Sequence, residues 1–218
     1  ANRHAACRYL PPRASIEPLW HAGGLPFLNH PFAMTSPRQA THPVHPQFLD
    51  RFSPRAFSGK KLSTQDIEQI VEAARWAPSA SNKQPWHFAY AINGDANWEA
   101  FATIPNEGNR RWCLNAGALL VVLSDKAASG KHSFDAGCAW GYLALQAHHM
   151  GLATHAMGGI EVEAARQVLK LADNWVVECL VAIGERGDKA SLPADLAERE
   201  APSPRKPLSE ILSAGPLA

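Results

Sequence analysis

The stretch APSASNKQPW, residues 77–86, separates a helical pattern from a strand pattern and thereby decides the fold. Before it, apolar residues recur at steps of three and four residues, at Ile67, Ile70, Val71 and Ala74. This period predicts an amphipathic helix behind the capping residue Ser63, with Asp66 three places on, and we expect Pro78 to stop it. The stretch itself, called the APS loop below, combines small and amide side chains with prolines that fix its shape. It suits either a loop that lets a flat ring approach the backbone or a simple helix stop and turn.

The other elements follow from the same kind of pattern. Strands are predicted at residues 86–92, 118–123 and 175–183, and helices at residues 133–150 and 162–171. Residues 118–123 are wholly apolar, which predicts a strand covered on both faces. The helix at 133–150 is apolar nearly all round, which suits a place between a sheet and a dimer partner. Because helices and strands mix without strict βαβ alternation, we expect an α+β fold.

Length and composition predict one main domain with an unusual N-terminal stretch. The chain has 218 residues, 46% of them hydrophobic, which is enough for one sizeable core. Residues 1–33 carry five prolines and no clear period, whereas Met34 opens a segment that resembles an ordinary start. We therefore expect a disordered leader or extension over 1–33, the alternative being a lid over a partner subunit. A single domain with a proline-rich C-terminal arm is expected over 34–218.

Charge and cysteine spacing exclude several classes of function. The 21 Lys and Arg balance 20 Asp and Glu, so no nucleic acid is expected as a partner. No run approaches the roughly 20 apolar residues of a membrane helix, so no membrane span is predicted. The four cysteines are far apart and form no zinc-type set, so we predict no metal site and expect free thiols in a reducing cytoplasm.

A second candidate binding segment is RFSPR, residues 51–55, called the RFSPR loop below. It places two guanidinium groups and a hydroxyl within five residues, immediately before the first predicted long helix. Arginine offers forked donors that match phosphate oxygens, and serine adds a neutral hydrogen bond. The segment therefore suits a phosphate group, the alternative being a solvated basic entry loop.

The order of these segments carries a resemblance to a known family. The chain contains RFSPRAF at 51–57, ARWAPSASNKQPWHF at 74–88, GLATHAMGG at 151–159 and AIGE at 182–185. This combination resembles the FMN-dependent nitroreductase family over most of residues 48–212. The resemblance implies a three-layer α/β/α subunit with a central, mostly antiparallel sheet. It also implies an intertwined homodimer with FMN bound at the subunit interface.

The resemblance assigns candidate cofactor-binding residues. The segment for the FMN phosphate, ribityl chain or pyrimidine edge corresponds to Arg51, Phe52, Ser53 and Arg55. The turn that packs on the flavin ring, expected from the opposite subunit, corresponds to Pro78, Ser79 and Ala80, followed by the amide residues Asn82 and Gln84. The backbone beside the reactive N5 edge corresponds to Met157, Gly158 and Gly159. A late basic residue for the phosphate corresponds to Arg205, with its neighbour Lys206 as the alternative.

The function that the resemblance implies is hydride transfer from NADPH or NADH, through FMN, to a small electrophilic acceptor by a ping-pong mechanism. Nitroaromatics, quinones and enals are the candidate acceptors. No protein acid or base is expected to be catalytic, because FMN carries the redox chemistry. The alternatives are a flavin-binding protein without turnover and a specialised flavin destructase or dehalogenase on the same scaffold. Residues 97–112 match no family pattern, and no glycine fingerprint distinguishes NADH from NADPH.

Overall fold

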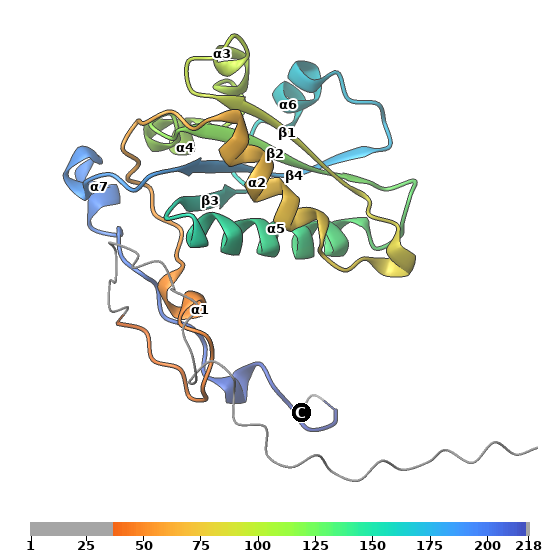
Figure 1. The fold of residues 1–218 in the computed structure, drawn as a ribbon, viewed down its shortest axis with the longest axis vertical. Coiled ribbons are helices and arrows are strands. Elements are labelled where there is room, and N and C mark those ends of the chain that lie inside the picture. The colour runs from red at the N-terminus through yellow and green to blue at the C-terminus, as the bar shows by residue number, and fades with distance from the viewer. Residues whose placement is uncertain (1–36, 217–218) are drawn as a thin grey trace, which may run out of the picture. The chain divides into compact units, whose positions relative to one another are not determined.

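The computed structural model describes residues 37–216 and contains one four-stranded antiparallel sheet (Figure 1). The strands are β1 (Trp86–Ile92), β2 (Ala118–Asp125), β3 (Ala153–Met157) and β4 (Trp175–Gly184). Their order in the sheet is β1-β2-β4-β3, so β2 and β4 are the central strands. The prediction of a leader over 1–33 lies outside the described residues.

Helices lie on both faces of this sheet. The α-helices are α1 (Gln47–Asp50), α2 (Thr64–Arg75), α3 (Trp98–Phe101), α4 (Glu107–Cys113), α5 (His132–His149), α6 (Val162–Leu169) and α7 (Ala194–Ala197). Short 3-10 turns occur at η1 (Ala80–Asn82), η2 (Lys189–Ser191) and η3 (Leu208–Glu210). In Figure 1, α2 and α5 cover one face, and α3, α4 and α6 lie over the other. No helix among residues 37–216 is long and apolar enough to cross a membrane.

Strand β2 explains why the sheet needs two helical layers. Its alternate residues Leu119 and Val121 belong to the core beside α3, α4 and α6, whereas Leu120 and Val122 belong to the core beneath α2 and α5. All four side chains are at most 1% exposed. A strand that is apolar on both faces must be covered on both faces, because exposing either side would leave a row of aliphatic groups in water. The predicted α+β, three-layer subunit is therefore confirmed.

The helix cap predicted at Ser63 is present at the start of α2. Ser63 Oγ accepts a hydrogen bond from the backbone N–H of Asp66, and the Asp66 carboxylate accepts one from the N–H of Ser63. This reciprocal capping box fixes the first turn. The helix ends at Arg75, however, three residues before Pro78, so the proline is not its direct stop.

Residues 97–113, where the sequence pattern predicts no helix or strand, contain two short elements. Two short helices, α3 and α4, form there because Trp98, Phe101 and Trp112 are buried against the sheet. Helices of four and seven residues carry too few turns for a visible period, and their stability comes from tertiary packing. Strand β3 was not predicted either, because its five residues alternate poorly between apolar and polar.

Candidate functional site

The backbone of the RFSPR loop is fixed by side chains from distant parts of the chain. The Glu200 carboxylate accepts hydrogen bonds from the N–H of Arg55 at 2.8 and 3.0 Å and from the N–H of Ala56 at 2.9 Å. His155 on β3 donates from Nδ1 to the carbonyl of Pro54 at 2.9 Å. Bonds to a carboxylate are among the stronger ones in proteins, so the loop is held in one conformation.

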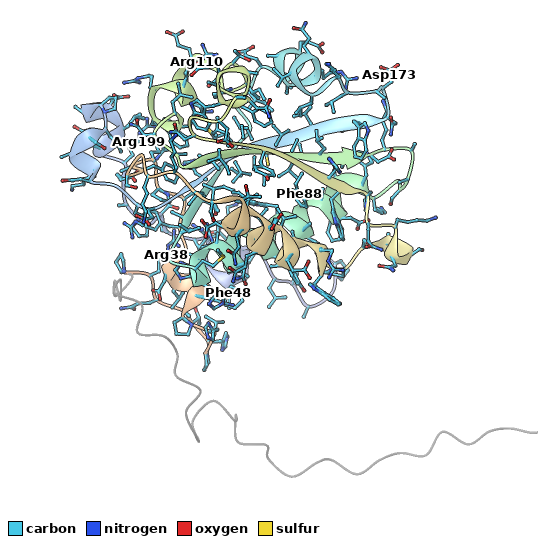
Figure 2. The ribbon with its side chains drawn as sticks, turned by 45° about the horizontal axis from the view of Figure 1, so that its top comes forward. Arg38, Phe48, Phe88, Arg110, Asp173 and Arg199 are labelled. Carbon is cyan, nitrogen blue, oxygen red and sulfur yellow. The ribbon has the colours of Figure 1, made fainter. Side chains whose placement is uncertain are left out.

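Arg38 ties the RFSPR loop to the C-terminal arm. Its Nη1 donates to the carbonyl oxygens of Leu49 at 3.2 Å and of Arg51 at 2.9 Å, and its Nε donates to that of Ser203 at 2.9 Å. Figure 2 shows Arg38 beside the α1 segment. The sequence alone did not indicate this residue, because a lone arginine thirteen positions before Arg51 belongs to no motif.

Three arginines gather at this place. Burial, then the charges of Arg38 and Arg205, lowers the pKa of Arg51. Burial and the charge of Arg205 likewise lower the pKa of Arg38. Arg51 Nη1 also lies 3.5 Å from Ser53 Oγ. Since like charges repel, this cluster favours an anion, and the forked guanidinium donors match the oxygens of a phosphate.

The neighbouring Phe52 has a packing contact of its own. Its ring is buried, and the guanidinium carbon of Arg186 lies 4.6 Å from the ring centroid. Such a cation–π contact stabilises the loop from its inner side. A direct contact of Phe52 or Arg55 with the cofactor stays a prediction.

Folding stability should fall with pH below about 6.5 through His155. Burial lowers the pKa of His155 below its ordinary value, and the charges of Arg55 and Arg51 lower it further, against the effect of the bond to Pro54. Between these two pKa values, His155 is protonated in the unfolded chain and neutral in the folded chain. The free energy of unfolding therefore decreases as the pH falls from about 6.5 towards the pKa of the folded state. Urea unfolding at pH 7.5, 6.5 and 5.5 checks this. His155→Gln should make the free energy of unfolding depend less on pH. The control His42→Gln, at an exposed position, should leave the pH dependence unchanged. The same pH dependence in His155→Gln and in the wild type would contradict the prediction.

The APS loop has the strained backbone that marks a specialised loop. Three residues other than glycine take positive φ values: Ser81 at 52°, Asn82 at 54° and Gln84 at 47°. Each such residue costs on the order of 1 kcal/mol or more, which persists only where the surroundings enforce it. Here Ser79 Oγ accepts from the N–H of Gln84 at 3.0 Å, and Gln84 Nε2 donates to the carbonyl of Asn82 at 3.1 Å. The loop is more than a helix stop and turn.

A pocket opens between the APS loop and the first turns of α5. Its volume is about 350 Å³, and it is lined by Pro78, Ser79, Ala80, Lys131, Phe134, Asp135 and Cys138. Asp135 is only 2% exposed, and its Oδ2 accepts from the N–H of Ala80 at 3.2 Å. The carboxylate thus anchors the loop to α5, a contact between residues 55 positions apart that no sequence motif indicates.

The glycines after β3 differ in their surroundings. Gly158 is exposed, and a Cβ built on it meets nothing within 4 Å. A Cβ on Gly159 would come within 2.7 Å of Asn106 Nδ2 and 2.8 Å of Asn109 Nδ2, so any larger residue there would have to displace these two amides. Met157 is buried in the core beneath them. The pair therefore presents bare backbone at the end of an edge strand.

The structure does not bring all predicted site residues together within one subunit. The APS loop contacts Asp135 in the first turn of α5. The RFSPR loop directly follows α1, whose neighbour His45 lies 6.3 Å, ring to ring, from His149 at the other end of α5. Fourteen residues of helix separate these two ends, about 21 Å at 1.5 Å per residue. One chain thus places the APS loop and the RFSPR loop at opposite ends of α5.

Comparisons with known proteins identify the family of this chain. The model of the Nitroreductase family matches residues 49–185. An Archaeoglobus fulgidus protein, named for NADH dehydrogenase/NAD(P)H nitroreductase activity, is 31% identical over 151 residues, which cover 64% of this chain and 83% of that protein. Six further curated relatives match over only 20% to 38% of their own length.

Solved structures show the same fold. A structure described as an oxidoreductase containing FMN is 45% identical, with a TM-score of 0.82, and the match covers 84% of this chain and 98% of that one. A Desulfovibrio desulfuricans nitroreductase in complex with FMN is 26% identical, with a TM-score of 0.64, over 82% of this chain and all of that one. Since the family model spans the RFSPR loop, the APS loop and all four strands, the chain belongs to the nitroreductase family.

Proposed function

We propose that this protein is an FMN-dependent oxidoreductase that passes hydride from NADPH or NADH to a small electrophilic acceptor. The observation that carries the proposal is the arginine cluster of Arg38, Arg51 and Arg205, in a chain of the nitroreductase family that also has the glycine pair Gly158–Gly159. A cationic cluster suits the FMN phosphate, and exposed glycines suit the close approach of a flat ring. The residues present therefore fit FMN.

FMN supplies the redox chemistry when bound, and the residues of the chain bind and orient it. Arg51, with Ser53 beside it, holds the phosphate end, supported by Arg38 and Arg205. The Gly158–Gly159 backbone would line the reactive edge of the ring, because glycine lets a ligand come close to the backbone. The APS loop, with Pro78, Ser79, Ala80, Asn82 and Gln84, packs on the ring from the opposite subunit.

We infer a homodimer, because the two loops predicted to bind one FMN lie at opposite ends of α5. If α5 packs antiparallel against its copy, the APS loop of one subunit meets the RFSPR loop of the other. The outer stripe of α5 supports this packing, because Phe134 is 72% and Tyr142 is 45% exposed. Gly137 and Gly141 on the same stripe leave open space that lets a second backbone approach. Large exposed apolar side chains beside small residues are typical of an interface.

Mixing two inactive variants should restore FMN binding. In a mixed dimer of Arg51→Ala and Ala80→Trp chains, one interface site carries both changes and the other carries neither, so about half of the normal FMN stoichiometry should return. The measurement is FMN retained after the two tagged chains are refolded together and the mixed dimer is purified. A mixed dimer that retains no more FMN than either parent would contradict a site shared between subunits.

The proposal extends to the acceptor and the order of the reaction. Nitroaromatics, quinones and enals are the acceptors proposed, and they enter after the oxidised nicotinamide has left, in a ping-pong cycle.

We place the activity in the cytoplasm and assign the FMN-binding domain to residues 34–218. In this proposal the tail at residues 201–216 is an arm that packs over the partner subunit. The exposed Leu208, Ile211 and Leu212 at the end of this arm are available for such a contact.

The visible spectrum of the purified protein, recorded without oxygen, tests the function. Flavin bands should bleach with NADPH or NADH and return when a quinone or nitroaromatic is added. Bands that never bleach would leave a flavin-binding protein without turnover. The absence of flavin bands, even after FMN is supplied, would overturn the proposal.

A further inference from the structure

The stretch before α4 forms a clamp on the Gly158–Gly159 segment. The N–H of Glu161 donates to the carbonyl of Ile104 at 2.8 Å, and the N–H of Asn106 donates to the carbonyl of Gly159 at 3.1 Å. Two segments about 55 residues apart thus run antiparallel for a few residues beside the glycines. Residues 104–106 belong to the part of the sequence that matches no family pattern. In the structure their backbone forms hydrogen bonds with the segment that contains the glycines.

Two asparagines complete the clamp. Asn109 Nδ2 donates to the carbonyl of Gly159 at 2.8 Å, so that oxygen accepts from both Asn106 and Asn109. The side chain of Asn106 in turn accepts from the N–H of Asn109 at 3.0 Å, which caps α4 and holds the two residues together. Both amide nitrogens also lie where a Gly159 Cβ would stand. The Gly159–Ile160 peptide is therefore fixed by hydrogen bonds on one side and by packing on the other.

The clamp also decides where the N–H of Gly159 points. The carbonyl of Gly158 accepts from the N–H of Ile160 at 3.1 Å, which orients the Gly158–Gly159 peptide. In a planar trans peptide the N–H points opposite to the carbonyl, so the N–H of Gly159 is directed away from Ile160. This N–H has no acceptor among residues 37–216. A backbone donor without a protein acceptor beside an exposed glycine is available to a ligand.

We propose that Asn106 and Asn109 are positioning residues that aim the N–H of Gly159 at the N5–O4 edge of the flavin ring. The proposal rests on the proposed function, since it concerns the same cofactor. The two asparagines touch neither nicotinamide nor acceptor, and they act through the Gly159 backbone. They set how readily the bound flavin is reduced, whereas the arginine cluster sets how tightly it is bound.

The test compares Asn109→Ala with Asn97→Ala. Asn97 is an exposed asparagine next to α3 whose side chain makes no cap bond, so it is a matched control. Asn109→Ala should shift the midpoint potential of the bound flavin, measured by dye equilibration, and slow its reduction by NADPH about tenfold in stopped flow. FMN affinity should stay within about fivefold, because only one indirect neutral hydrogen bond is lost. The amide of Ile160 in the protein without FMN should exchange its hydrogen faster.

Gly159→Ala is the second variant. The added Cβ must displace both amides, so it should shift the potential in the same way without removing either asparagine. An unchanged potential and reduction rate in both variants would overturn the proposal, as would equal changes in Asn97→Ala. Failure of the wild type to bind FMN would instead overturn the proposed function, so the two failures are distinguishable.

Discussion

Arg51→Ala is expected to weaken FMN binding by about 10- to 150-fold. A charge-assisted hydrogen bond contributes about 1.5–3 kcal/mol, and each 1.4 kcal/mol corresponds to a factor of ten in affinity. Arg51 is half-buried and its charge interacts with those of both Arg38 and Arg205, so the change removes one of the three cations of the cluster. The measurement is the dissociation constant of FMN, obtained from the quenching of its fluorescence by apoprotein.

Two further variants make this test specific to the arginine cluster. Arg205→Ala should also weaken binding, because the charge of Arg205 acts directly on Arg51. Lys206→Ala should change the dissociation constant little, since its Nζ lies 3.8 Å from Glu210 Oε2 in an exposed ion pair. If Lys206→Ala raises the dissociation constant of FMN as much as Arg205→Ala or more, Lys206 and not Arg205 is the phosphate-binding residue of the tail. Normal affinity of Arg51→Ala would remove the phosphate assignment.

Leu119→Ala and Leu120→Ala should each lower the free energy of unfolding by about 2–5 kcal/mol. The two residues are consecutive, both are fully buried, and they point into separate cores on opposite faces of β2. In a strand with one solvent face, one of the two changes would be mild. Two large losses therefore report two covered faces. Urea unfolding followed by circular dichroism, at one fixed protein concentration, measures both values.

Val162→Ala is the control for these two core changes. It also shortens an aliphatic side chain to alanine, but Val162 begins α6 and is 45% exposed, so the free energy of unfolding should change by less than about 0.5 kcal/mol. A loss below about 1 kcal/mol for either core leucine would mean that its face of the sheet is not packed as described.

The sequence predicted several features that depend on neighbouring residues. The capping box at Ser63, the strand at 86–92 and the doubly buried run at 118–123 were all predictable from period and composition. The prediction that the RFSPR loop binds a phosphate also rests on side chains that are close together in the chain. The short elements α3, α4 and β3 could not be predicted from the sequence, because packing against the rest of the sheet stabilises them and their own residues show no clear hydrophobic period.

The sequence by itself determined the α+β class, the two loops that carry binding chemistry and, through their order, the family. Only the tertiary structure decided which distant residues support them: Arg38 and Glu200 on the RFSPR loop, Asp135 on the APS loop, and Asn106 with Asn109 on Gly159. It also placed the two loops at opposite ends of α5, which is why the site is expected to need two subunits. The physical reason is that local period and capping act over a few residues. A single hydrogen bond or guanidinium cluster can instead join any two points that the packing of the core brings together.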